Sequence, residues 1–132
     1  MEKYNGTITM ASKDDNLIAT HRCHITWQTE GFIAQFEEKG EGYTTFTTIN
    51  FDGSSCVIER VGDISSKMLF VENQITDFTY GIKEGEFEGK IATEKLAVYK
   101  TESKFMLVIG YGMAFGDEKF APKRTRITIK ED

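Results

Sequence analysis

The sequence predicts an all-β protein, an antiparallel barrel of about 8–10 strands with little or no helix. Three observations predict this class. Apolar and polar residues alternate with a period of two over most of the chain, which is typical of strands and not of helices. Residues that favour turns interrupt these runs every 8 to 15 residues or so, as in an antiparallel meander. Pro122 is the only proline, so little interrupts the regular structure.

The predicted turns separate the strands in chain order. They combine Gly, Asn, Asp and Ser, whose backbones and side chains favour turns. They fall at residues 13–16, 30–31, 40–42, 52–53, 62–63, 72–73, 83–85, 101–103 and 116–117. The stretches between them are rich in Thr, Ile, Val and aromatic residues, which suit a pleated surface.

The first clear alternations lie in the middle of the chain. Residues 66–71 and 76–80 each alternate strictly, which predicts two short strands. Residues 87–98 alternate as well, but the apolar positions change from odd to even numbers near Glu94 and Lys95. Such a change predicts a β-bulge at that point.

The last two strands have the strongest patterns. Residues 105–115 place bulky side chains on the odd positions, while the even positions include small residues such as Gly110 and Gly112. Residues 124–130 alternate Thr and Ile with mostly charged side chains. Each pattern predicts a strand with one face toward the core.

We expect one domain over residues 1–132, because no linker or change of composition divides the chain. Closure into a barrel removes the strand edges of such a sheet most completely. A two-sheet sandwich is the alternative architecture. Alternation by itself does not separate the two.

The composition limits the function. The chain is 39% apolar and 28% charged with a net charge of -5, which is typical of a globular protein. An acidic chain lacks the basic surface of a constitutive nucleic-acid binder, so we expect no nucleic-acid partner. No stretch approaches the roughly 18 apolar residues of a membrane helix, so we expect no membrane partner. The N-terminal residues lack the apolar segment of a secretory signal, and we expect a cytoplasmic protein with Cys23 and Cys56 reduced.

Several short motifs in the second half occur in a recognisable order. They include Ile58–Gly62, Ser66–Phe70 and Tyr80, and the chain closes with Ile127–Glu131, while Phe36-Glu37-Glu38 lies upstream. Thr93, Leu96, Val98 and Tyr111 stand between them. In this order the sequence resembles the YwiB-like family of small bacterial proteins. The resemblance implies a calycin-like (lipocalin-like) barrel, a fold that often holds apolar ligands, but it implies no activity.

One segment departs from that family's pattern. The family tends to follow this tyrosine with Thr-Pro-x-Gly, whereas here Tyr80 is followed by residues 81–85, Gly-Ile-Lys-Glu-Gly. The turn is therefore expected to be built differently.

Arg60 is the first candidate for a binding residue. By alternation it shares a face with Cys56 and Ile58, so we expect its guanidinium to point into the barrel. A buried cation needs a partner, and Glu37 or Glu38 is the natural one. Arg60 then either grips the carboxylate or phosphate of a ligand or forms a structural ion pair.

The alternation also predicts which side chains line the interior. They are Met68, Phe70, Phe78, Tyr80, Phe87, Ile91, Leu107, Ile109, Tyr111 and Met113. They form either the wall of a ligand cavity or a core filled by side chains. Among them, Met68, Phe70, Tyr80, Leu107, Ile109 and Tyr111 are candidates for ligand contact alongside Arg60.

The sequence offers no catalytic or metal site. On a strand, His21 and Cys23 share one face and His24 the other, which is too few ligands for zinc. No local signature pairs a cysteine with a histidine for catalysis. We therefore expect no enzyme, metal or cofactor. The function hypothesis is a barrel that binds a small apolar or anionic amphiphilic molecule, and the alternative is a structural or protein-interaction domain with a filled core.

Overall fold

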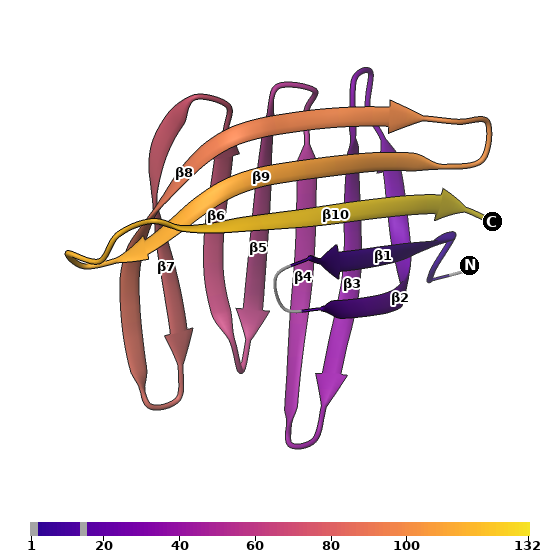
Figure 1. The fold of residues 1–132 in the computed structure, drawn as a ribbon. Coiled ribbons are helices and arrows are strands. Elements are labelled where there is room, and N and C mark those ends of the chain that lie inside the picture. The colour runs from indigo at the N-terminus through magenta and orange to yellow at the C-terminus, as the bar shows by residue number, and fades with distance from the viewer. Residues whose placement is uncertain (1–2, 14–15) are drawn as a thin grey trace.

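The computed structural model describes residues 3–13 and 16–132, and its regular structure consists of ten strands (Figure 1). They are β1 (Gly6–Ser12), β2 (Leu17–Trp27), β3 (Phe32–Gly40), β4 (Tyr43–Phe51), β5 (Ser55–Gly62), β6 (Ser65–Val71), β7 (Gln74–Ile82), β8 (Gly85–Lys100), β9 (Phe105–Phe115) and β10 (Ala121–Glu131). The prediction of an all-β fold is confirmed. In the described ranges, no helix has the length and apolar character needed to cross a membrane.

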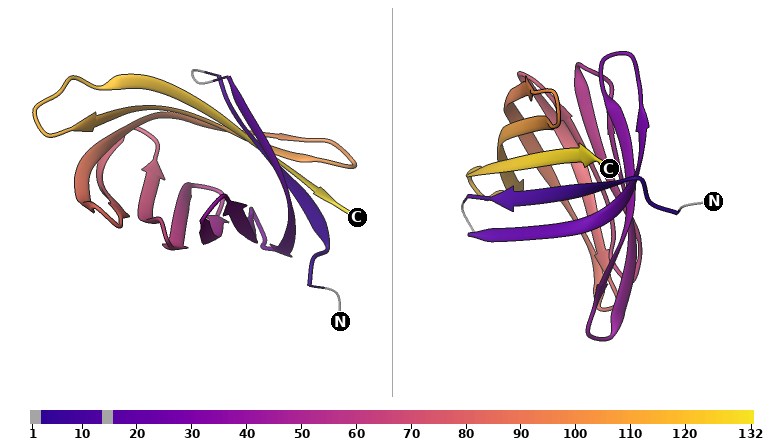
Figure 2. Two further views of the ribbon diagram at one scale, coloured as in Figure 1. Left: turned by 90° about the horizontal axis from the view of Figure 1, so that it is seen from below. Right: turned by 90° about the vertical axis from the view of Figure 1, so that its right-hand side faces the viewer.

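Each strand pairs with its sequence neighbours in antiparallel orientation, and β1 pairs with β10 to close a barrel. Closure decides between the two predicted architectures in favour of the barrel. The barrel is flattened, however, into two layers (Figure 2). Strands β3 to β7 form one layer, and β8 to β10 cross them together with β1 and β2, as the ribbon in Figure 1 also shows.

Two of the strand pairs around the barrel are short. Strand β2 pairs with β3 through residues 24–27 and 32–35 alone, and β6 pairs with β7 through 65–67 and 79–81. By contrast, β1 pairs with β2 and with β10 along its whole length. The backbone ladder is therefore interrupted at two places around the barrel.

Strand β8 contains the predicted bulge. Thr93 pairs with Tyr111 and Lys95 pairs with Gly110, so Glu94 is the extra residue. A bulge bends its strand and increases the local twist. Before the bulge, β8 pairs with both β7 and β9, and after it with β9 alone. The prediction of a bulge at this position is confirmed.

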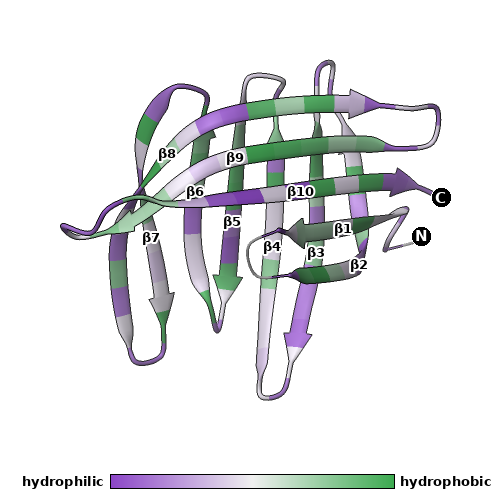
Figure 3. Cartoon of the chain, viewed as in Figure 1, coloured by the Kyte–Doolittle hydropathy of each residue, from purple (hydrophilic) through white to green (hydrophobic). Residues whose placement is uncertain are grey.

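The core is densest at the end of the barrel that holds Phe32, Phe51 and Phe105. Their rings pack against one another with centroid distances of 5.3–6.1 Å. Isoleucines from several strands complete this core and are buried: Ile8, Ile25, Ile49, Ile58, Ile91, Ile109, Ile127 and Ile129. The alternation of apolar and polar residues that produces this burial is visible along the strands in Figure 3.

The residues predicted to line the interior lie mostly where alternation places them. Phe70, Phe78, Ile91, Leu107 and Ile109 are buried. Met68, Tyr80, Tyr111 and Met113 are partly buried against the same core. Phe87 has the predicted inward parity, but it is not buried in the interior, because 49% of its surface is exposed.

The turns fall close to the predicted positions. At residues 13–16, Asp14 and Asp15 lie outside the described residues. Asn73 has a φ of 64° and Gly116 a φ of 57°, so each adopts the left-handed conformation that tight turns require. The turn after Tyr80 is short, since β7 ends at Ile82 and β8 begins at Gly85.

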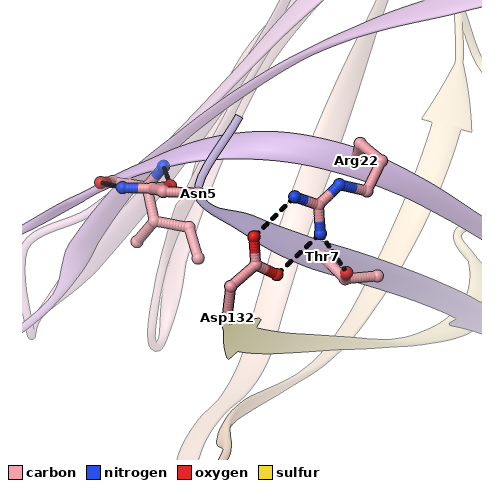
Figure 4. Close-up of polar contacts among 5 residues, drawn as sticks. Asn5, Thr7, Arg22 and Asp132 are labelled. Atoms are coloured by element: carbon pink, nitrogen blue, oxygen red, sulfur yellow. Dashed lines mark hydrogen bonds and ion pairs between the residues drawn. The ribbon is translucent and has the colours of Figure 1, made fainter. Parts of the chain in front are cut away.

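Polar contacts hold the two ends of the described chain together (Figure 4). The side chain of Asn5 accepts a hydrogen bond from the backbone N–H of Ile25 at 2.6 Å and donates one to its carbonyl oxygen at 3.0 Å. The guanidinium of Arg22 donates to both carboxylate oxygens of Asp132, at 2.7 and 2.5 Å, and also to the hydroxyl of Thr7. The hydrogen bond from Arg22 lowers the pKa of Asp132 below its usual value.

We predict that Gly89→Ala destabilises the protein by about 1–3 kcal/mol or more, the cost of overpacking a core. An added Cβ would stand 2.4 Å from Cε1 of Phe78 and 2.6 Å from the carbonyl oxygen of Ala114. Urea unfolding measures the change. Gly85→Ala is the matched control, because a Cβ there meets no atom within 4 Å. Equal stability of the two variants would contradict the close packing of β8.

We predict that Cys23 and Cys56 resist thiol reagents in the native protein. Both are buried free thiols, and burial raises the pKa of Cys56 to about 12 and that of Cys23 to about 11, from an ordinary 9.0. The thiolate that reacts is therefore scarce at pH 8. A colorimetric disulfide reagent should react slowly with native protein and rapidly with two thiols after denaturation.

The same shifts make stability depend on pH. Because folding favours the neutral thiols, their contribution is complete below pH 9 and is lost as the pH rises toward 11 to 12. Rapid reaction of either thiol in native protein at pH 8 would contradict this account.

Candidate binding site at the open end of the barrel

The two ends of the barrel differ in how well their inward side chains are covered. The packed end holds Phe32 and Phe51, which are buried. The other end, here called the open end, carries the connections β1–β2, β3–β4, β5–β6, β7–β8 and β9–β10. There Leu17, on the inward side of β2, is 64% exposed, and Phe87 is 49% exposed. These two inward-facing side chains are thus exposed to solvent at the open end.

A row of inward side chains crosses six strands near the open end. Successive antiparallel pairs join Phe36 on β3 to Thr47, then to Arg60, Ser66, Tyr80 and finally Phe87 on β8. Cross-strand neighbours on one face have Cβ atoms about 4.5–5.5 Å apart. The neighbouring row toward the packed end is apolar: Ala34, Ile49, Ile58 and Met68. Arg60 therefore lies at the boundary between an apolar and a polar part of the interior.

Arg60 forms an ion pair with one of its two predicted partners. Its Nε lies 3.3 Å from Oε1 of Glu38, and the two side chains are 23% and 24% exposed. The hydroxyl of Thr47 donates to the same Glu38 oxygen at 2.7 Å. Among the described residues, nothing hydrogen-bonds to the terminal nitrogens of Arg60. Glu37 instead faces the opposite side of β3 and pairs with Lys39 at 2.9 Å.

Two buried hydroxyls inside the barrel have no hydrogen-bond partner in the described chain. Ser66 is 6% exposed and Thr93 is 2% exposed, and neither side-chain oxygen is paired. A buried hydroxyl without a partner costs about 1–3 kcal/mol. Ser66 stands between Arg60 and Tyr80 in the row. Neither residue was identified from the sequence as a site residue. Their positions on the inward side of alternating strands were the only sequence feature that could have pointed to them.

An aromatic contact covers the interrupted junction between β2 and β3. The ring of His21 stacks on that of Phe36, with centroids 5.0 Å apart and planes 25° apart. Cys23 on the same side of β2 is buried, whereas His24 is exposed on the other side. Within residues 3–13 and 16–132, no three His, Cys, Asp or Glu side chains lie close enough together to hold a metal ion.

The structure brings only part of the predicted site together. Arg60 and Tyr80 flank Ser66, and Met68 lies in the adjacent row. Phe70 and Tyr111 contact each other edge to face at 5.0 Å. Leu107 and Ile109 belong to the buried core and are not exposed at the open end.

A groove of about 380 Å³ touches Arg60 and Ser66, but it is not the interior of the barrel. The rest of its lining comes largely from outward side chains of β5, β6 and β7, including Glu59, Lys67 and Thr79. The inner side of the open end is a different surface from this groove. Its chemistry is that of an arginine and a free hydroxyl beside methionine and tyrosine.

Comparison with known proteins agrees with this architecture. The crystal structure of the ywiB protein from Bacillus subtilis superposes with a TM-score of 0.75, covering 100% of this chain and 95% of that one, at 18% identity. This likeness shows a shared fold. No curated protein matches the sequence. A family model described as a domain of unknown function, DUF1934, matches residues 3–129. The chain therefore belongs to the DUF1934 family and has the fold of YwiB.

Proposed function

We propose that this barrel binds a small anionic amphiphile at its open end, with Arg60 holding the anionic group. One observation carries the proposal: the terminal nitrogens of a partly buried arginine and the buried hydroxyl of Ser66 lie on neighbouring strands, without partners in the described residues. A carboxylate or phosphate accepts hydrogen bonds from both kinds of donor. An anion there would satisfy groups that the chain leaves unpaired.

The contact with Glu38 supports this role for Arg60. Glu38 uses one oxygen for both Nε of Arg60 and the hydroxyl of Thr47. This contact fixes the inner edge of the guanidinium and leaves its outer, two-nitrogen edge for a ligand. Bidentate contacts of that edge with carboxylate or phosphate are the strongest that arginine makes.

The neighbouring side chains suit the apolar part of such a ligand. Met68, Tyr80 and Tyr111 are only partly buried, although they point inward. Methionine adapts its shape to irregular ligands, and tyrosine offers a large apolar surface with a polar tip. An amphiphile would cover these side chains while its head group contacts Arg60.

This proposal describes a binding protein, not an enzyme, and it involves no metal or cofactor. We also propose a cytoplasmic location, which the two free buried thiols support because oxidising compartments favour disulfides. The alternative is a structural or interaction domain whose interior holds no ligand. The experiments below separate the two.

We predict that Arg60→Ala weakens binding of the fluorescent anionic amphiphile 1-anilinonaphthalene-8-sulfonate about tenfold or more, since charge-assisted hydrogen bonds contribute about 1.5–3 kcal/mol. Fluorescence titration measures the change. The uncharged analogue N-phenyl-1-naphthylamine should bind both proteins similarly. Lys67→Ala is the control, because Lys67 is exposed on the outer side of β6. Unchanged binding by Arg60→Ala, or equal loss for the uncharged dye, would contradict the role of Arg60 as the anion-binding group, and no binding of either dye to the unmodified protein would favour a barrel that holds no ligand.

We predict that Ser66→Ala changes stability and binding in opposite directions. Removing an unpaired buried hydroxyl should raise the melting temperature or leave it unchanged, because no native hydrogen bond is lost. The same change should weaken binding of the anionic dye several-fold. Ser65→Ala, on the exposed side of β6, should leave dye binding unchanged. A fall in both stability and binding would indicate a structural role for Ser66.

A further inference from the structure

Charge is distributed unevenly between the two layers of the barrel. Residues 28–84, which include β3 to β7, contain four Lys and Arg but ten Asp and Glu. Residues 1–27 and 85–132, which include the strands of the other layer, together contain twelve Lys and Arg and eleven Asp and Glu. A protein with a net charge of -5 thus concentrates its positive charge in one layer. Such a separation creates a surface that attracts anionic partners.

Five of these cations lie on the outer side of the strands in that layer. We call this outer side the cationic face and define it by these five residues: Arg22, Lys95, Arg124, Arg126 and Lys130. The acidic residues of the layer's strands are confined to the first part of β8, which holds Glu86, Glu88 and Glu94, and to Glu131 at the end of β10. Arg22 is paired with Asp132. Lys95 on β8 and Arg124, Arg126 and Lys130 on β10 extend the face across the layer.

An apolar groove of about 430 Å³ lies in the cationic face. Its walls include the apolar side chains of Ala11, Ile18, Met106 and Val108, together with Lys13, Arg124 and Arg126. Register places Arg126 directly between Ala11 on β1 and Val108 on β9, with Ile18 beyond Ala11. Ile18, one of the side chains that line the groove, is 73% exposed.

We propose that the cationic face binds an acidic segment of a partner protein that inserts an apolar side chain into this groove. Carboxylates beside the inserted side chain would meet the cations around the groove, and charge complementarity would set the orientation. A concave apolar groove can accept a protruding side chain from a partner. Side chains buried in this way contribute most of the binding free energy of many protein interfaces. The proposal concerns the outer side of the layer, so it does not rest on ligand binding inside the barrel.

Other anionic partners fit the face less well. Single-stranded nucleic acid stacks its bases on aromatic side chains, whereas the groove is lined by aliphatic and thioether groups. A lipid surface is penetrated by apolar side chains that project from a protein, whereas this apolar surface is hollowed. Both classes are therefore outcomes that the experiment must exclude.

A displayed library of random peptides, selected on the immobilised protein, tests the proposal. Enriched peptides should combine Asp or Glu with a large apolar residue. Binding of a synthetic enriched peptide, measured by fluorescence anisotropy, should weaken tenfold or more with Arg126→Glu and several-fold with Ile18→Ser. Lys67→Glu, the same charge change on the other layer, should have little effect.

Specific outcomes would overturn the proposal. The first is that the selection enriches no acidic peptides, and the second is that Lys67→Glu weakens peptide binding as much as Arg126→Glu does. The third is that Arg126→Glu weakens binding of phosphatidylglycerol vesicles or of a thymidine oligonucleotide but not binding of the peptide. The anionic dye separates this proposal from the open-end site. Arg126→Glu should bind the dye as the unmodified protein does, which also shows that the variant is folded.

Discussion

The whole architecture depends on the position of β1 between β2 and β10. This strand of seven residues pairs along its full length on both sides, and without it the sheet would have two free edges. Free edges of this length template aggregation. The contacts of Asn5, Arg22 and Asp132 reinforce the closure at one end of β1, where the first and last described residues meet. Long-range pairing of this kind is slow to form, because its loop-closure entropy must be offset before the contacts exist.

Closure does not make the barrel uniform. The short β2–β3 and β6–β7 ladders let the two layers cross instead of wrapping evenly. The layers meet closely where Phe32, Phe51 and Phe105 interlock, and they cover their inward residues less completely at the other end. The polar side chains of the interior are also found mainly at one end of the barrel. Glu38, Arg60 and Ser66 all lie toward the less covered end. A charged group is tolerated there because it remains within reach of water and of a paired carboxylate.

Alternation predicted which side of a strand a residue occupies, and this was enough for much of the fold. It identified Leu107 and Ile109 as core residues, and its phase change located the bulge at Glu94. It also placed Arg60 inward, where charge made Glu37 or Glu38 the natural partner, and the structure pairs it with Glu38. Alternation does not predict, however, how close a residue lies to either end of the barrel. Phe87 has the parity of buried Ile91 but lies near the open end, so it is exposed.

The remaining features depend on register between distant strands. A serine at an inward position looks the same in sequence whether or not it has a partner, and only pairing with β5 placed Ser66 beside Arg60. Barrel closure likewise depends on the alignment of β1 with β10, which no local pattern encodes. From the sequence, only the net charge of the whole chain was considered, not its distribution between strands. The acidic total concealed a layer rich in Lys and Arg.

The meeting of residue 5 with residue 132 has a consequence for engineering the molecule. The backbone N–H of Asp132 donates to the carbonyl oxygen of Asn5 at 2.9 Å, so a short linker between the two ends would follow a path the fold already provides. A circularly permuted chain, joined there and reopened at exposed Lys83 and Glu84, would keep every strand pair. It would also move the new termini to the less covered end of the barrel.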